Sequence, residues 1–294
     1  MLREILARIR NFEIRIRKAV SGQMRGNFDS VFKGSGLEFA DVRAYQYGDD
    51  VRRIDWNVSA KGEDTYIKVF REEKEQTIFF LLDVSQSQFL KKKAAAKIQV
   101  GKEICSILAF SAVKEGSEVG LICFSDQKEA YVKPDKGIKK GYELFVKLFK
   151  LVPQSAKTNL NAFFLFALNL IKRRSIAIII SDFLDTNYEH ALKALARKHD
   201  LIVIHLIDEQ EIELPPLGIV PIMDVETQKQ VWVNASSSQF RKQWRKDFEE
   251  RQQFLETFCR KFSANYLSIN THEDFVPKLV KLFKVRKRGE KASY

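Results

Sequence analysis

The chain has 294 residues, of which 45% are hydrophobic and 30% are charged, and its formal net charge is +12. So many large apolar residues exclude intrinsic disorder and are enough for one large domain or two small ones. The longest apolar runs, Ile78–Leu82 and Ala162–Leu168, are much shorter than the ~20 residues that span a bilayer, so we expect no transmembrane segment.

Two further features indicate a cytoplasmic protein. Residues 1–20 alternate charged with apolar residues and contain no uninterrupted apolar core of a secretory signal. The three cysteines, Cys105, Cys123 and Cys259, are widely separated among apolar neighbours. We therefore expect buried, reduced thiols in a reducing compartment.

Most of the positive charge lies at the two ends of the chain. Residues 1–26 carry seven basic and two acidic residues, and residues 277–294 carry seven basic residues and one acidic residue. Such ends can attract nucleic acid or anionic lipid, so polyanion binding is kept as an alternative function. The simpler interpretation is a solvated helix face and a soluble basic tail, since no motif for sequence-specific recognition of nucleic acid is found.

In chain order, the first predicted element is an amphipathic helix over residues 2–20. Residues 37–75 are predicted to be extended, with a turn at 47–49 and a strand at 66–70. From residue 77 onward, apolar strands alternate with helices. The predicted strands are 77–83, 118–125, 129–133, 175–182, 201–207 and 265–269, and the predicted helices are 91–114, 141–151, 161–173, 187–198, 237–262 and 273–284. A β-hairpin is predicted at 219–224 and 230–234.

This order of elements predicts an α/β fold. Strands that are apolar throughout have both faces covered, which is typical of parallel sheets between helices. We therefore expect a doubly wound, mostly parallel sheet with helices on both faces. Residues 76–286 are assigned to this domain, with an insertion at 208–236, and residues 287–294 to a basic tail. The N-terminal helix and extended segment, residues 1–75, are expected to pack on the main domain.

Oxygen-bearing side chains lie in three loops at the strand ends. Residues 83–87 form a D-x-S-x-S motif after the first strand of the domain, Thr158 precedes the helix at 161–173, and Asp182 ends the most apolar strand. Doubly wound sheets bind ligands at the carboxyl ends of their strands, so we expect these loops to meet there. The candidate metal ligands are Asp83, Ser85, Ser87, Thr158 and Asp182.

Hydroxyl and carboxylate oxygens of this kind suit Mg²⁺ or Mn²⁺ in octahedral coordination, with water in the remaining positions. Because only two of the five side chains are carboxylates, a bound ion would still attract one more anion, such as a carboxylate of another protein. The alternative is purely structural, with Asp83 in an Asx turn and Ser87 as the cap of the following helix.

We expect no catalytic residues. The chain has no G-x-x-x-x-G-K-[ST] loop, no G-x-S-x-G elbow and no H-E-x-x-H pair. Its four histidines are scattered: His190, His199, His205 and His272. His205 lies in an apolar strand, where it is expected to be a core residue. Nucleophilic chemistry at Ser85 or Ser87 would therefore lack a nearby base.

The five candidate ligands resemble the metal-ion-dependent adhesion site of von Willebrand factor A domains, which has a D-x-S-x-S loop, a Thr and an Asp in corresponding loops. The resemblance implies a von Willebrand factor A-like fold. It also implies that the three loops lie on the same face and that a metal is held at these five positions.

The upstream sequence is more specific. Residues 34–39 read GSGLEF, residues 43–56 read RAYQYGDDVRRIDW, and Ser59-Ala60-Lys61 follow. This pattern resembles the signature of a bacterial family, domain of unknown function 58, in which it precedes an A-type domain, and the resemblance covers about residues 20–210. Gln88 stands where that family often has Met. Family members are often encoded beside MoxR-type AAA+ ATPases, so the resemblance implies a metal-dependent interaction module that works with such an ATPase.

Arginines and aspartates alternate within the signature, so ion pairs are available without an outside partner. One interpretation is a clamp that fastens the N-terminal segment to the main domain, with the tryptophan buried beneath it. The other is a docking surface or a second metal position. The residues concerned are Arg43, Asp49, Asp50, Arg52, Arg53, Asp55 and Trp56.

The leading functional hypothesis is a non-enzymatic adaptor that binds an Asp or Glu of a partner protein through Mg²⁺ and works with a MoxR-type AAA+ ATPase. The first alternative is a metal-dependent phosphoester hydrolase, with a second ion held by Asp49, Asp50 or Asp55. The second alternative is polyanion binding through the basic ends, which would weaken steeply with salt.

Overall fold

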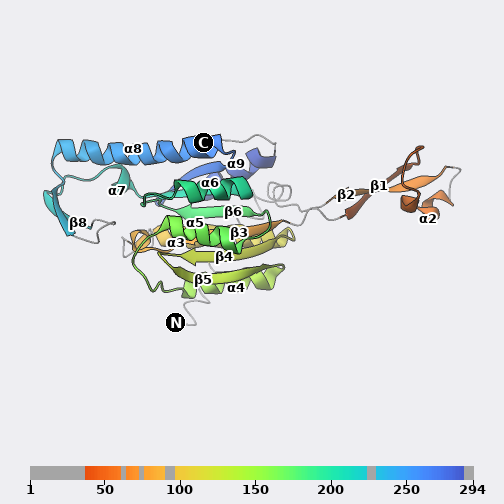
Figure 1. Ribbon diagram of the computed structural model, residues 1–294, viewed down its shortest axis with the longest axis horizontal. Coiled ribbons are helices and arrows are strands. Elements are labelled where there is room, and N and C mark those ends of the chain that lie inside the picture. The colour runs from red at the N-terminus through yellow and green to blue at the C-terminus, as the bar shows by residue number, and fades with distance from the viewer. Residues whose placement is uncertain (1–36, 61–63, 73–75, 90–96, 224–229, 288–294) are drawn as a thin grey trace.

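A six-stranded sheet forms the centre of the protein (Figure 1). The computed structural model describes residues 37–60, 64–72, 76–89, 97–223 and 230–287. The strands of the sheet are β3 (Thr77–Asp83), β4 (Glu118–Phe124), β5 (Lys128–Asp135), β6 (Ile176–Ser181), β7 (Asp200–Ile207) and β10 (Asn265–Asn270). They lie in the order β10-β7-β6-β3-β4-β5, and all pairs are parallel except β4 with β5. The predicted α/β fold with a mostly parallel sheet is confirmed.

Helices cover both faces of this sheet (Figure 1). They are α3 (Lys97–Lys114), α4 (Ile138–Lys150), α5 (Leu160–Leu170), α6 (Glu189–Lys198), α8 (Ser238–Lys261) and α9 (Val276–Lys287). The central strand β3 alternates between two cores. Ile78, Phe80 and Leu82 pack with α3, α4 and α9, whereas Phe79 and Leu81 pack with α5, α6 and α8. Because both faces are buried, the strand is apolar throughout, as the sequence predicted.

The strand order places a topological switch point between β3 and β6. From β3 the chain crosses to β4 and β5 on one side, and it then returns to β6 on the other side of β3. Sheets of this kind bind ligands at such a point, beyond the carboxyl ends of the two strands. The end of β3 is Asp83, and Asp182 directly follows β6.

Most predicted elements lie within a few residues of the observed ones. The helix predicted over 91–114 is observed from Lys97, and residues 90–96 lie outside the described part. The helix predicted over 2–20 and the tail after Lys287 also lie outside it. A short helix, α7 (Glu209–Ile212), was not predicted. Among the described residues, no helix combines the length and the apolar character needed to cross a membrane.

The predicted hairpin is confirmed in the insertion between β7 and α8. β8 (Ile219–Met223) pairs antiparallel with β9 (Gln230–Asn234), with Val220 opposite Val233. The insertion begins with α7 and leads through the hairpin into α8, so α7 connects the end of β7 to this appendage (Figure 1).

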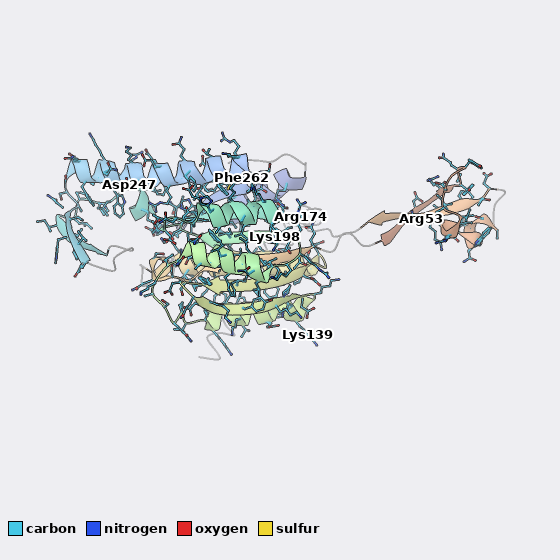
Figure 2. The ribbon with its side chains drawn as sticks, in the orientation of Figure 1. Arg53, Lys139, Arg174, Lys198, Asp247 and Phe262 are labelled. Carbon is cyan, nitrogen blue, oxygen red and sulfur yellow. The ribbon has the colours of Figure 1, made fainter. Side chains whose placement is uncertain are left out.

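The family-signature segment forms a separate small unit. β1 (Leu37–Ala44) pairs antiparallel with β2 (Tyr66–Glu72), and a 3₁₀ turn, η2 (Val51–Arg53), and the short helix α2 (Trp56–Ser59) lie between them. Figure 1 shows this unit to one side of the sheet, and Figure 2 shows its Arg53 far from Lys198 and Phe262 of the α/β domain. The packing on the main domain that was predicted for residues 1–75 is not seen for the described part of this segment.

Candidate metal site at the carboxyl edge of the sheet

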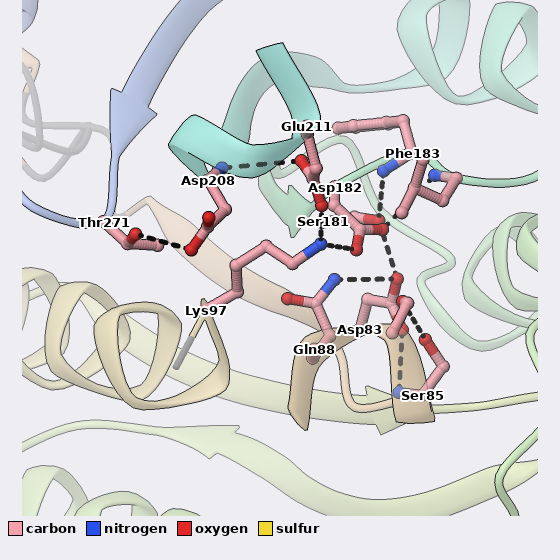
Figure 3. Close-up of polar contacts among 12 residues, drawn as sticks. Asp83, Ser85, Gln88, Lys97, Ser181, Asp182, Phe183, Asp208, Glu211 and Thr271 are labelled. Carbon is pink, nitrogen blue, oxygen red and sulfur yellow. Dashed lines mark hydrogen bonds and ion pairs between the residues drawn. The ribbon is translucent and has the colours of Figure 1, made fainter. Parts of the chain in front are cut away.

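The D-x-S-x-S loop begins at Asp83, which is 1% exposed at the end of β3. Asp83 Oδ1 accepts a hydrogen bond of 2.9 Å from the Ser85 main-chain N–H, which closes the turn. The hydroxyl of Ser85 lies 3.1 Å from the hydroxyl of Ser87, which is in the 3₁₀ turn η3 (Gln86–Phe89) that follows. The turn thus holds a carboxylate and two hydroxyls close together, and the Asx-turn interpretation of Asp83 is correct whether or not a metal binds (Figure 3).

β6 supplies the second carboxylate. Asp182 is fully buried, and its neighbour Ser181 donates a hydrogen bond of 2.7 Å to Asp83 Oδ2. The side chain of Gln88 also donates to Asp83 Oδ2, at 3.4 Å. Gln88 is therefore a hydrogen-bond donor at the site. Asp83 and Asp182 meet across the switch point, as predicted.

The two carboxylates differ in their electrostatic environment. Burial and the negative charge of Asp182 raise the pKa of Asp83 to about 6. Burial also acts to raise the pKa of Asp182, but the charge and hydrogen bond of Lys97 outweigh it, so this pKa is lowered. Two buried carboxylates this close repel each other, and a cation between them would relieve the repulsion.

Sequence reasoning missed Lys97, the cation that the protein itself places here. Its side chain is 4% exposed, and its Nζ lies between Asp182 Oδ2 and Glu211 Oε1 of α7 (Figure 3). Burial acts to lower the pKa of Lys97, but the two carboxylates raise it, so the ammonium group stays charged. The sequence did contain a sign of this role. Lys97 is in helical register with Gly101 and Ile104, which face the core, and a lysine at such a position is expected to be paired with a carboxylate.

The loop of Thr158 reaches the site through its main chain. The Gln86 N–H donates to the Ala156 carbonyl at 3.2 Å, which places this loop beside η3. The next residue, Asn159, caps α5 by accepting a hydrogen bond of 2.8 Å from the Ala162 N–H. Thr158 itself is half-buried. The structure therefore brings together Asp83, Ser85, Ser87 and Asp182 by side-chain contacts, and the Thr158 loop by a main-chain hydrogen bond.

A carboxylate of β5, which the sequence did not indicate, fixes the shape of the Thr158 loop. Glu129 accepts hydrogen bonds from the main-chain N–H groups of Gln154, at 2.8 Å, and Ser155, at 3.0 Å. It also accepts one of 2.8 Å from the Ser125 hydroxyl. Burial acts to raise the pKa of Glu129, but these hydrogen bonds lower it overall.

The side chains fit a hard divalent cation that relies partly on hydroxyls and water. Within the described ranges, no group of three or more His, Cys, Asp or Glu side chains is arranged to hold a metal ion. An ion at Asp83 and Asp182 would therefore be completed by hydroxyl oxygens, such as those of Ser85 and Ser87, and by water. Buried carboxylates beside a pair of hydroxyls are oxygen donors of the type that Mg²⁺ and Mn²⁺ accept.

The charged residues of the family signature bond within their own unit. Arg43 forms a two-point ion pair with Asp49, with N–O distances of 2.7 and 2.8 Å, and this pair lowers the pKa of Asp49. Asp50 accepts from the Arg52 N–H at 3.0 Å and caps η2, and Asp55 caps α2. The predicted clamp to the main domain is therefore wrong for these carboxylates, because each satisfies a neighbouring group in the same unit.

Trp56 also differs from expectation. Its side chain is 70% exposed, together with those of Tyr47 and Val51, instead of being buried. The clamp interpretation therefore fails for Trp56, whereas the docking interpretation is still compatible with its exposure.

The expected burial of His205 and of the cysteines is confirmed. His205 is buried, and its Nδ1 lies 2.8 Å from the hydroxyl of Tyr266. Burial and the charge of Arg251 lower its pKa to about 3. The three cysteines are free and buried.

The comparison with protein families decides the family. Residues 41–254 match the family described as Protein of unknown function DUF58. The chain belongs to this family. Uncharacterized proteins of Mycobacterium bovis and Mycobacterium tuberculosis are 24% identical to this DUF58 protein over 296 aligned residues, which cover 99% of the chain and 92% of each relative. An uncharacterized protein of Mycobacterium avium is 32% identical over 121 residues, which cover 40% of the chain and 70% of the relative.

Similar solved structures include an aerotolerance-related membrane protein from Bacteroides fragilis, with 14% identity and a TM-score of 0.47 over 73% of the DUF58 chain and 99% of that chain. A von Willebrand factor type A protein from Catenulispora acidiphila has 11% identity and a TM-score of 0.40, and the match covers 76% of the DUF58 chain and 44% of that chain. The SpRpn10 VWA domain has 12% identity and a TM-score of 0.36, and the match covers 70% of the DUF58 chain and 94% of that domain. The α/β fold itself rests on the strand order described above.

Proposed function

We propose that this DUF58 protein is a metal-dependent protein-interaction module. Mg²⁺ or Mn²⁺ would be held by Asp83, Ser85, Ser87, Thr158 and Asp182, as in a metal-ion-dependent adhesion site. When bound, the ion would supply an open coordination position for an Asp or Glu carboxylate of a partner. The observation that carries the proposal is the pair of buried carboxylates, Asp83 and Asp182, which meet beside two hydroxyls at the switch point of the sheet.

The surroundings of the serines favour binding over catalysis. The Ser85 hydroxyl lies next to that of Ser87, and neither has an imidazole beside it among the contacts of the described residues. His205 is engaged with Tyr266 and has a strongly lowered pKa, so it is a poor general base. A phosphoester hydrolase with a second ion at Asp49, Asp50 or Asp55 is not supported, because these carboxylates serve as an ion pair and as helix caps in the β1–β2 unit.

The partner in this proposal is a MoxR-type AAA+ ATPase or a client protein of that ATPase. The family resemblance suggests the ATPase, since no nucleotide-binding loop is present in this chain. A second contact surface is available on the β1–β2 unit, where exposed Tyr47, Val51 and Trp56 lie close to Arg52 and Arg53 in the chain. Aromatic and arginine side chains are the residues that most often anchor protein interfaces.

The proposal is tested by affinity purification of partners from native cells, using the full chain in Mg²⁺ or in EDTA. Partners should be captured in Mg²⁺ and lost both in EDTA and with Asp83→Asn. Asp135→Asn is the matched control, because Asp135 is exposed at the opposite edge of the sheet, opposite Val119 at the start of β4. Equal capture under all conditions would overturn the metal-bridged mechanism.

A further inference from the structure

Lys97 places a buried positive charge directly against a candidate metal ligand. Its Nζ contacts Asp182 Oδ2, and Asp182 Oδ1 accepts a hydrogen bond of 3.2 Å from the Leu184 N–H. Both oxygens of Asp182 are therefore engaged, and a metal ion that binds this carboxylate must share it with the ammonium group. Figure 3 shows Lys97 extending toward Asp182 and Glu211 from the side of the site opposite Phe183.

The charges of the cluster leave room for a divalent ion. Asp83, Asp182 and Glu211 together carry −3 when ionised, and Lys97 reduces this to −2. A divalent cation at Asp83 and Asp182 would balance the charge of these four residues. Burying an ammonium group is costly unless it is paired, and Lys97 has a second carboxylate, Glu211, with which it stays paired when an ion competes for Asp182.

Glu211 also connects the cluster to the insertion. It lies in α7, and its N–H donates to the Asp208 carbonyl at 2.9 Å, while the Asp208 N–H donates back to Glu211 Oε2 at 3.4 Å. These two bonds fix the carboxylate at the junction between β7 and the insertion. The position of Lys97 therefore depends on a segment that leads to the β8–β9 hairpin.

We propose that the ammonium group of Lys97 acts as a tethered cation, that is, a positive charge that the chain itself holds against the metal site. Lys97 and Glu211 together form a positioning pair for that site. This inference rests on the proposed function. Lys97 holds Asp182 in place before a divalent ion binds and then weakens the binding of that ion by repulsion. Glu211 limits this weakening, because it adds negative charge and attracts the ammonium group away from Asp182.

The proposal predicts opposite effects of two substitutions on the binding of Mn²⁺ to the full chain, measured from the electron paramagnetic resonance of the free ion. Lys97→Met keeps an unbranched side chain, one atom shorter than lysine, but removes the charge, so Mn²⁺ should bind at least about tenfold more tightly. Glu211→Gln should bind Mn²⁺ about threefold or more weakly, because one negative charge is lost and Lys97 is left with Asp182 alone.

Lys140 and Glu143 on α4 provide matched controls, because they form an ion pair of 2.9 Å in which the side chain of Glu143 is 58% exposed and that of Lys140 is 11% exposed. Lys140→Met and Glu143→Gln should change the Mn²⁺ affinity by less than about twofold. Hydrogen exchange of residues 209–223 gives a second measurement. Mg²⁺ should change the protection of this segment in the wild type and less so in Glu211→Gln.

The outcomes separate this inference from the proposed function. If the wild type binds Mn²⁺ and folded Lys97→Met binds it equally or more weakly, the tethered cation is overturned and the metal site stands. If only Lys97→Met binds, Lys97 acts as the cation of the site and the metal-bridged function of the wild type is overturned. If no variant binds, both are overturned. If Lys97→Met does not fold, unchanged binding by Glu211→Gln overturns the inference.

Discussion

Asp83 and Asp182 are the same chemical group at the ends of adjacent strands, yet their environments differ. Among the residues that the structure describes, Asp83 accepts hydrogen bonds from neutral donors, namely Ser181, Gln88 and the Ser85 N–H. Asp182 contacts an ammonium group. This difference explains why burial raises one pKa and why Lys97 lowers the other. At the residue scale, Asp83 is therefore the carboxylate that most needs a further cation.

Asp83→Asn should stabilise the protein in EDTA and abolish its stabilisation by Mg²⁺. In the folded protein the pKa of Asp83 is about 6, above the ordinary value of 3.8. The free energy of unfolding therefore rises as pH falls through about 6, and at pH 7 the ionised carboxylate destabilises the folded state. Removing that penalty should raise the free energy of unfolding by about 1–3 kcal/mol at pH 7. Urea unfolding in EDTA and in Mg²⁺ measures both effects.

Asn suits the site because Ser181 and Gln88 can each reverse the direction of their hydrogen bonds. Asp135→Asn serves again as the control and should leave both measurements unchanged. A less stable Asp83→Asn in EDTA would show that the Asp83 carboxylate is already satisfied without a metal.

His205 should make the fold sensitive to acid. Its pKa is about 3 in the folded protein and 6.5 ordinarily, so the unfolded chain binds a proton that the folded chain excludes. The free energy of unfolding should therefore fall as pH decreases from 6.5, by about 1.4 kcal/mol per pH unit. Denaturant unfolding at pH 7, 6 and 5 should show a shallower fall for His205→Gln than for the wild type. His272→Gln, at an exposed position, should behave as the wild type.

At the scale of the elements, each loop at the site is held by a specific polar contact from another element. β6 holds the D-x-S-x-S loop through Ser181, α3 holds Asp182 through Lys97, and β5 holds the Thr158 loop through Glu129. The strands bring the loops to one edge, and these contacts then fix their shapes. A site formed in this way is arranged before any ligand binds, which reduces the ordering cost of binding.

Glu129→Gln should loosen the Thr158 loop without unfolding the domain. One amide oxygen cannot replace a carboxylate that accepts from two N–H groups and a hydroxyl, so we expect a loss of about 1–2 kcal/mol of stability. Hydrogen exchange of residues 154–159 should become faster. Glu143→Gln is the matched control, because Glu143 is 58% exposed and its surface ion pair contributes little. Unchanged exchange in Glu129→Gln would show that the loop is held by other contacts.

At the scale of the whole molecule, the protein combines a deeply buried α/β core with two small antiparallel hairpins. Each of the two small units exposes a tryptophan: Trp56 of α2, between β1 and β2, is 70% exposed, and Trp232 of β9 is 66% exposed. Two-stranded sheets have little core of their own, so exposed aromatic side chains on them are candidates for contacts with partners.

Trp56→Ala should separate docking from folding. Because the side chain is mostly exposed, the free energy of unfolding should change by less than about 0.5 kcal/mol. Capture of Mg²⁺-dependent partners should fall at least about tenfold if this surface is a docking site. Ile138→Ala is a control, because Ile138 is an exposed apolar residue at the start of α4 on the α/β domain. A large loss of stability in Trp56→Ala would instead show that the indole packs within the protein.

The sequence by itself determined the strands, their apolar faces and the positions of Asp83, Ser85, Ser87 and Asp182. These features depend on local periodicity and on the general rule that parallel strands end at one edge of a sheet, so residues near each other in the chain are enough to predict them.

Only the tertiary structure decided the partners of Lys97 and Glu129 and the exposure of Trp56. Lys97 meets Asp182 and Glu211 from elements far away in the chain, and Glu129 meets a loop that begins beyond α4. The energy of a buried charge depends on which groups the fold places around it, and the burial of a tryptophan depends on whether another surface reaches it. Neither condition is encoded in the spacing of neighbouring residues.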